Sequence, residues 1–125
     1  MIVTATFAAL LLAQGASASL LVEPQQIEAA ESGYAQLARG EAVAAVERLE
    51  MLQTENPGDP AILINLAAAY IEIGRLDDAS RAYRQAIASR ERMQLETADG
   101  SWEDSRVLAR SGLSQLEGSQ AWAMK

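Results

Sequence analysis

The sequence predicts an all-α protein, a short α-solenoid made of two helix hairpins and a C-terminal capping helix. Apolar residues recur at intervals of three and four over most of the chain, which is the spacing of one helix face. Many of these residues return 34 positions later, and a regular period of that length indicates a helical repeat. No stretch carries a strand pattern, so no strand is expected. At 125 residues, the chain is long enough for one domain.

The second hairpin is the clearer of the two. Asp59 suits the N-cap of a helix because its carboxylate accepts free amide protons of the first turn, and Pro60 suits the first helical position. A helix is therefore predicted over residues 60–73. Gly74 suits the left-handed residue that often ends a helix. A second helix is predicted from residue 76 to about residue 90.

The first hairpin is a fainter copy of the second. Its helices are predicted from Glu23-Pro24 to about residue 38, and over about residues 41–54. Six residue pairs separated by 34 positions relate the two hairpins: Gly33 and Ala67, Leu37 and Ile71, Gly40 and Gly74, Ala45 and Ala79, Leu49 and Tyr83, and Leu52 and Ala86.

These residues resemble the tetratricopeptide repeat family. The second repeat, about residues 60–93, is the stronger match. The first, about residues 26–59, departs at Ser32 and Gln36, where the second repeat has large apolar or aromatic residues. The whole pattern resembles small bacterial secreted or periplasmic proteins built from such repeats, so the resemblance implies a tetratricopeptide-type α-solenoid. Its hallmark residues in this chain are Pro57, Leu66, Ala67, Tyr70, Gly74, Ala79, Tyr83 and Ala86.

One more helix is predicted after the second hairpin. Asp99-Gly100 is a turn signal, and Ser101 suits an N-cap followed by acidic residues. The capping helix is predicted over about residues 102–117 and is expected to end at Gly118. The predicted layout is then a helical domain of residues 23–117 and a C-terminal tail of residues 118–125.

The capping helix is expected to cover the open end of the second repeat. Trp102, at its start, is expected in the core, with Arg106 stacked on it one turn later. Because repeat proteins usually need about three units, the helix is expected to be required for stability, unless the protein self-associates. Its predicted packing residues are Val107, Leu108, Leu113 and Leu116.

The N-terminal segment predicts export. Residues 1–22 carry no charged side chain, residues 2–12 form an apolar run, and Ala16-Ser17-Ala18 fits a cleavage site. We expect a signal peptide over residues 1–18 and a periplasmic mature protein. Because no Lys or Arg precedes the apolar run, the alternative is an uncleaved anchor that holds the protein at the inner membrane, facing the periplasm.

Composition excludes several classes of function. Seventeen acidic and ten basic residues give a net charge of −7, which disfavours binding to nucleic acid. Without cysteine or histidine, the chain has no disulfide, no thiolate or imidazole metal site and no His-based catalytic triad. We expect no catalytic residue, no metal and no cofactor. Asp77-Asp78 fits a first helical turn, with Asp77 and Arg81 at ion-pair spacing.

By resemblance to the family, the first helices of the repeats line a concave groove. An apolar groove suits an amphipathic helix or an extended apolar peptide, and only Asn65 matches the polar residues with which some family members clamp a peptide carboxylate. Ile64→Asp is then expected to abolish partner capture while the helices stay intact. The predicted partner-binding residues are Ile27, Tyr34, Leu37, Ile64, Asn65, Ala68, Ile71 and Glu72.

The predicted function is non-catalytic protein–protein interaction in the bacterial cell envelope, as a binding module or scaffold. The alternative is a self-associating or membrane-tethered structural element. In that case the groove is filled by the C-terminal segment, with Trp122 as the plug, or by a second copy of the chain.

Overall fold

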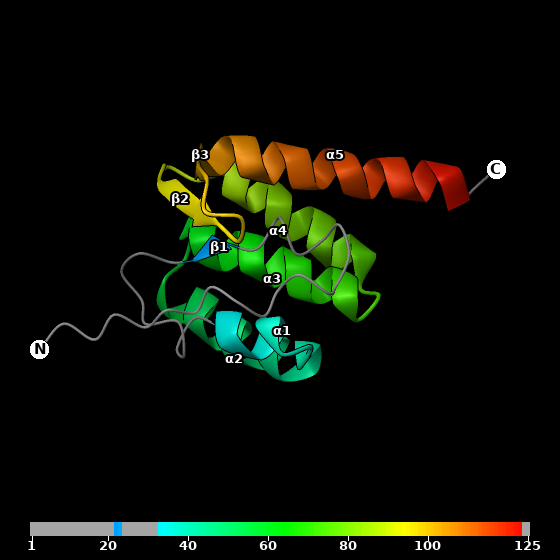
Figure 1. Cartoon of the computed structure of the whole chain (residues 1–125), viewed down its shortest axis with the longest axis horizontal. Coiled ribbons are helices and arrows are strands. Elements are labelled where there is room, and N and C mark those ends of the chain that lie inside the picture. The colour runs from blue at the N-terminus through cyan, green and yellow to red at the C-terminus, as the bar shows by residue number, and fades with distance from the viewer. Residues whose placement is uncertain (1–21, 24–32, 124–125) are drawn as a thin grey trace, which may run out of the picture.

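The computed structural model describes residues 22–23 and 33–123, which form a stack of helices with a small sheet at one end (Figure 1). The described part is a short all-α solenoid in which helix hairpins follow one another and α5 lies along α4 at the end of the stack. In chain order the elements are β1 (Val22–Glu23), α1 (Tyr34–Ala38), α2 (Ala42–Glu55), α3 (Pro60–Glu72), α4 (Leu76–Ala88), β2 (Gln94–Thr97), β3 (Trp102–Asp104) and α5 (Ser105–Ala123).

The α3–α4 hairpin closely follows the sequence prediction. Asp59 caps α3, since its Oδ1 accepts hydrogen bonds from the amides of Ala61 at 2.9 Å and Ile62 at 3.4 Å. Gly74 has a φ of 78°, the left-handed conformation that separates α3 from α4. The observed helices end one or two residues earlier than predicted, which is ordinary fraying of helix ends.

The α1–α2 hairpin has the same design, but its start differs from the prediction. Gly40 repeats the left-handed turn of Gly74, with a φ of 76°. The predicted helix start at Glu23-Pro24 is wrong, because Glu23 belongs to β1. Residues 24–32 of that predicted helix lie outside the described residues.

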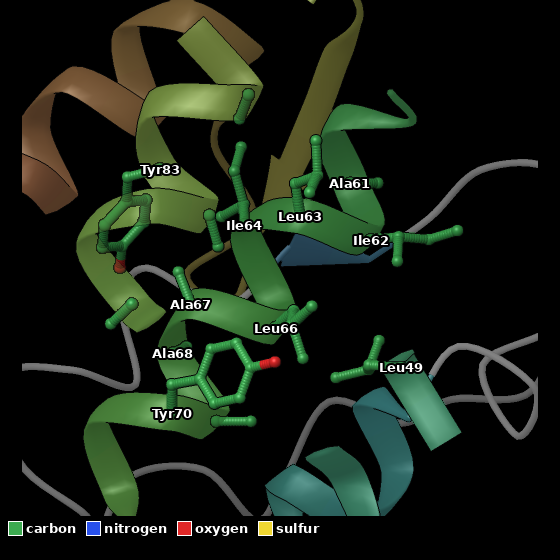
Figure 2. Packing of buried hydrophobic residues seen from close by; sticks show 14 of the residues in the cluster. Leu49, Ala61, Ile62, Leu63, Ile64, Leu66, Ala67, Ala68, Tyr70 and Tyr83 are labelled. Atoms are coloured by element: carbon green, nitrogen blue, oxygen red, sulfur yellow. The ribbon is translucent and has the colours of Figure 1, made fainter. Parts of the chain in front are cut away.

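The core centres on α3. Every residue from Pro60 to Tyr70 is buried, because α3 packs against α2 on one side and α4 on the other. Figure 2 shows Ile64 and Ala67 on the side of Tyr83, while Leu66 and the Tyr70 hydroxyl point toward Leu49. Apart from Asn65, the first half of α3 is apolar, which lets the helix fill this central position, where an amphipathic helix would bury more polar groups.

The expectation of no strands is wrong. The strands β1, β2 and β3 form an antiparallel sheet in that order, and the side chain of Leu95 on β2 is fully buried. The β2–β3 turn is held by Asp99, whose Oδ1 accepts hydrogen bonds from the Ser101 amide at 2.9 Å and from the hydroxyls of Thr97 and Ser101. Strands of two to four residues are too short for their alternation to be visible in the sequence.

The last helix, α5, packs against α4 and α3 and so caps the stack. Leu108 and Leu116 are buried as predicted, and Leu113 is partly buried. The predicted end at Gly118 is wrong, since α5 continues to Ala123. A glycine within a helix costs only about 1 kcal/mol, which neighbouring residues can offset.

Three expectations about the start of α5 are also wrong. Trp102 is 53% exposed and lies on β3 rather than in the core. Arg106 donates from Nη2 to the Ser89 carbonyl at 3.0 Å, and Val107, a predicted packing residue, is 45% exposed. The expected N-cap at Ser101 is replaced by Asp104, whose Oδ1 accepts from the Arg106 amide at 2.8 Å.

Among the described residues, none of the helices has the length and apolar character of a membrane span.

Candidate functional site

The structure places most of the predicted groove residues inside the protein. One, Ile27, lies outside the described residues. At the C-terminal end of α3, Ile71 is partly buried and Glu72 is exposed. The other five are buried, two on α1 and three on α3: Tyr34 (4% exposed), Leu37 (7%), Ile64 (0%), Asn65 (0%) and Ala68 (2%).

Burial of Ile64 changes what its substitution tests. An aspartate at a fully buried position loses its hydration, which makes its charged form costly. The expectation that Ile64→Asp leaves the helices intact is therefore wrong, because that change strikes the core directly. Among the described groove residues, those that a partner can reach in this conformation are Ile71 and Glu72. The binding role of the predicted set stays a prediction.

A charged cluster lies beside this accessible end of α3. The Arg75 guanidinium lies 4.6 Å from the centroid of the Tyr70 ring and pairs with Asp78 at 2.8 Å. The hydrogen bond from Arg75 lowers the pKa of Asp78, while burial and the nearby carboxylate of Glu50 raise the pKa of Tyr70. These contacts fix the α3–α4 turn that borders Ile71.

Asp78 also accepts a hydrogen bond from Arg81, the first arginine within α4. Arg81 Nη1 lies 2.8 Å from Asp78 Oδ1. The expected Asp77–Arg81 pair is thus replaced by one at a spacing of three residues, which brings side chains of a helix together as a spacing of four does. Because these groups are largely exposed, the cluster orients the turn more than it stabilises the fold.

Sequence reasoning missed a surface hollow between α4 and α5 that is lined mainly by polar and charged residues. At this hollow, Arg84 Nη2 of α4 donates a hydrogen bond to Glu117 Oε1 of α5 at 2.9 Å. The two residues are 33 positions apart, so their meeting depends on how α5 crosses α4, which no local pattern reveals. The hollow is lined by Asp77, Ser80, Arg81, Arg84, Gln85, Ala88, Glu117 and Gln120.

The described residues offer little for metal chemistry. Within residues 22–23 and 33–123, no three acidic side chains gather in a way that would hold a metal ion. The carboxylates are instead used in surface pairs with arginine, as at Asp78 and Glu117, and in the β2–β3 turn, as at Asp99.

Comparison with known proteins gives one match to a repeat family, over part of the chain. The family model of the tetratricopeptide repeat matches residues 36–92, which run from within α1 to just beyond α4. No similar protein was found among curated proteins or among solved structures. Proteins of this family are typically non-catalytic, and their repeats generally mediate protein–protein interactions. The matched residues and the two stacked hairpins together support a tetratricopeptide-repeat protein, whose fold is a short all-α solenoid of that type.

Proposed function

We propose that the protein is a non-catalytic interaction module, which binds a helix or an extended peptide of a partner protein in the groove beside α3. The observation that carries the proposal is the match of residues 36–92 to a repeat whose general use is protein binding. The net charge of −7 favours a protein partner over a nucleic acid, whose phosphates are bound by basic residues.

The chemistry of α3 supports an apolar partner surface. Its first eleven residues are all buried, and its sequence there is apolar apart from Asn65. Ile71 and Glu72 form the accessible rim, with Arg75 one turn beyond. A partner that first meets this rim would reach Ile64 and Ala68 only by replacing contacts within the protein with contacts of its own.

We further propose that the protein works in the bacterial cell envelope. Residues 1–18 have the pattern of a signal peptide, which would deliver the chain to the periplasm. If these residues are not cleaved, the same segment would anchor the protein in the inner membrane. N-terminal sequencing of the exported protein separates the two cases, because cleavage gives a chain that begins near Ser19.

A capture experiment tests the interaction. The mature chain serves as bait in a crosslinking pull-down from the native envelope, beside Ile71→Asp on the groove rim and Met51→Asp on α2. Met51 is 57% exposed and lies on the second helix of the first hairpin, so its variant controls for added charge. We expect the wild type and Met51→Asp to capture the same partner and Ile71→Asp to lose it. Equal capture by all three, with equal helix content, would move the site away from α3.

The alternative function, a self-associating element, makes a different prediction. A second copy in the groove would give a dimer whose population rises with protein concentration in sedimentation. The version in which Trp122 plugs the groove is wrong for this conformation, because Trp122 is 81% exposed near the end of α5. A concentration-independent monomer would leave partner binding as the function of the groove.

A further inference from the structure

The outer face of α5 is a second surface open to another molecule. The opposite face of the helix packs against α4 and α3 and buries Leu108 and Leu116, and Figure 1 shows α5 at the edge of the stack. Val107, near the start of the helix, is 45% exposed, and Trp122, near its end, is 81% exposed. A large apolar side chain therefore lies in water near each end of α5. The outer face carries five exposed residues, Val107, Arg110, Ser114, Glu117 and Trp122.

The charges of α5 are divided between its two halves. Arg106 and Arg110 lie in the first half, and the single acidic residue of the helix, Glu117, lies in the second. Arg110 forms no ion pair among the described residues, and the α5 side chains one turn away from it include no carboxylate. Arg106, four positions earlier, repels it, since like charges at this spacing destabilise a helix. A carboxylate from another molecule would therefore be favourable at Arg110.

The spacing of the outer-face residues fits a two-fold axis. Val107 and Trp122 are 15 positions apart, which is about four helical turns. Arg110 and Glu117 are seven positions apart, which is about two turns. Both pairs are centred within half a residue of Ser114, which is small and exposed. A second α5 that crosses this point antiparallel therefore sets its apolar ends and its charges opposite their complements, and each contact occurs twice.

Glu117 is able to accept this second arginine. Its Oε1 accepts the hydrogen bond from Arg84 of its own chain, which leaves Oε2 for another donor. The Glu117 side chain is 53% exposed, so an incoming guanidinium can reach it. A parallel pair of helices would instead bring arginine to arginine and Glu117 to Glu117. The charges therefore favour the antiparallel arrangement.

We propose that two copies of this chain associate through the outer faces of α5, which pair antiparallel about Ser114. Val107 contacts Trp122 of the second copy, and Arg110 pairs with Glu117 of the second copy. The proposal goes beyond the function of the α3 groove and does not depend on it. One helix from each copy makes a small interface, and the net charge of −7 on each copy opposes association. We therefore expect a weak dimer, with a Kd of about 10 μM to 1 mM.

Charge reversal in the full chain tests the proposal by sedimentation at increasing protein concentration. Arg110→Glu sets two carboxylates at each charged contact, and Glu117→Arg sets two arginines there. Each change should raise the Kd of the dimer about tenfold or more, because two symmetric contacts turn from attraction to repulsion. Arg90→Glu is the matched control, since Arg90 is exposed outside α5, and it should leave the Kd unchanged.

A mixture of the two variants gives the sharper result. Arg110→Glu and Glu117→Arg each dimerise poorly alone, but together they form a heterodimer with opposite charges at both contacts, so the mixture should regain the wild-type Kd. A loss of fold or of the Arg84 contact would not be rescued in this way. The chain that carries both changes should dimerise as well, and Trp122→Ser should weaken the dimer.

The same measurements separate this interface from the groove beside α3. Ile71→Asp should leave the dimer intact, whereas a second copy seated at the α3 groove would be lost with it. The proposal is overturned if no dimer forms up to about 1 mM, if Arg110→Glu acts no more strongly than Arg90→Glu, if the mixture stays monomeric, or if Ile71→Asp abolishes the dimer. Capture of a partner through Ile71 is independent of the first three results.

Discussion

Gly112 of α5 lies directly against the ring of Tyr83 of α4. A Cβ at Gly112 would come within 2.6 Å of Tyr83 Cε1 and 2.7 Å of its hydroxyl oxygen, which no packed side chain tolerates. Tyr83 is itself fully buried. The absence of a side chain at one position thus lets the capping helix close over Tyr83, the largest fully buried side chain among the described residues.

Gly112→Ala should therefore destabilise the protein, although alanine is the better helix former. We expect a loss of about 1–3 kcal/mol in the free energy of unfolding, because the Tyr83 ring has to move or α5 has to lift. Gly118→Ala is the matched control, since Gly118 lies in the same helix with open space around it. That change should stabilise by up to about 1 kcal/mol. Urea unfolding of both variants measures the difference, and equal effects would contradict the close approach.

Tyr83→Phe should leave stability unchanged or raise it at neutral pH. The Tyr83 hydroxyl is buried with no hydrogen-bond partner among the described residues, so its removal relieves a desolvation cost of about 1 kcal/mol. Urea unfolding at pH 7 measures the change. A clear loss of stability would mean that the hydroxyl makes a bond that this structure lacks.

The same residue predicts a loss of stability at high pH. Burial raises the pKa of Tyr83 to about 12, against about 10 in an unfolded chain. As the pH rises above about 10, the unfolded state gives up this proton and the folded state keeps it, so stability falls until the pH reaches about 12. The wild type should lose about 3 kcal/mol more than Tyr83→Phe over this window. Parallel stability curves would show that Tyr83 ionises freely in the fold.

Asp99 predicts an effect at the acid end. Hydrogen bonds from the Ser101 and Thr97 side chains and from the Ser101 amide lower the pKa of Asp99 to about 2. The stabilisation from this turn is present above the ordinary pKa of about 4 and is lost as the pH falls toward 2. Ser101→Ala should move the pKa of Asp99 back toward its ordinary value in an NMR titration, and Ser114→Ala on α5 should not.

Deletion of α5 should lower the melting temperature sharply. Without residues 105–125, Tyr83 of α4 loses the helix that packs against it, and each large side chain returned to water costs about 1.5–3 kcal/mol. Calorimetry of the shortened chain measures this. A melt at the original temperature would show that the two hairpins suffice without a cap.

The helical stack was predictable because its signals are local. Asp59 with Pro60, and the glycines at 40 and 74, mark helix boundaries within a few residues, and the 34-residue period links the two hairpins. The sheet was not predictable, since β2 pairs with β1, whose residues lie 73 to 75 positions earlier in the register Glu23 with Glu96 and Val22 with Thr97. The continuation of α5 past Gly118 was missed because one glycine does not end a well-packed helix.

The candidate groove was predictable in its residue types but not in its exposure. Periodicity shows that Ile64 and Ala68 share a face of α3, and the predicted groove requires that face to be accessible to a partner. The accessibility of that face depends on long-range packing, and both residues are buried in the structure. The arginine pairs of Arg81 and Arg84 also needed coordinates, because several carboxylates lie within reach of each in the sequence.

A photo-reactive amino acid at two positions tests the central claim, that this repeat protein binds its partner at the α3 groove. One replaces exposed Glu72 at the groove rim, and the other replaces exposed Met51 on α2. Illumination of cells should give one specific crosslinked protein from position 72, lost when Ile71→Asp is added, and none from position 51. The same crosslinked protein from both positions, or from position 72 in the presence of Ile71→Asp, would contradict the account.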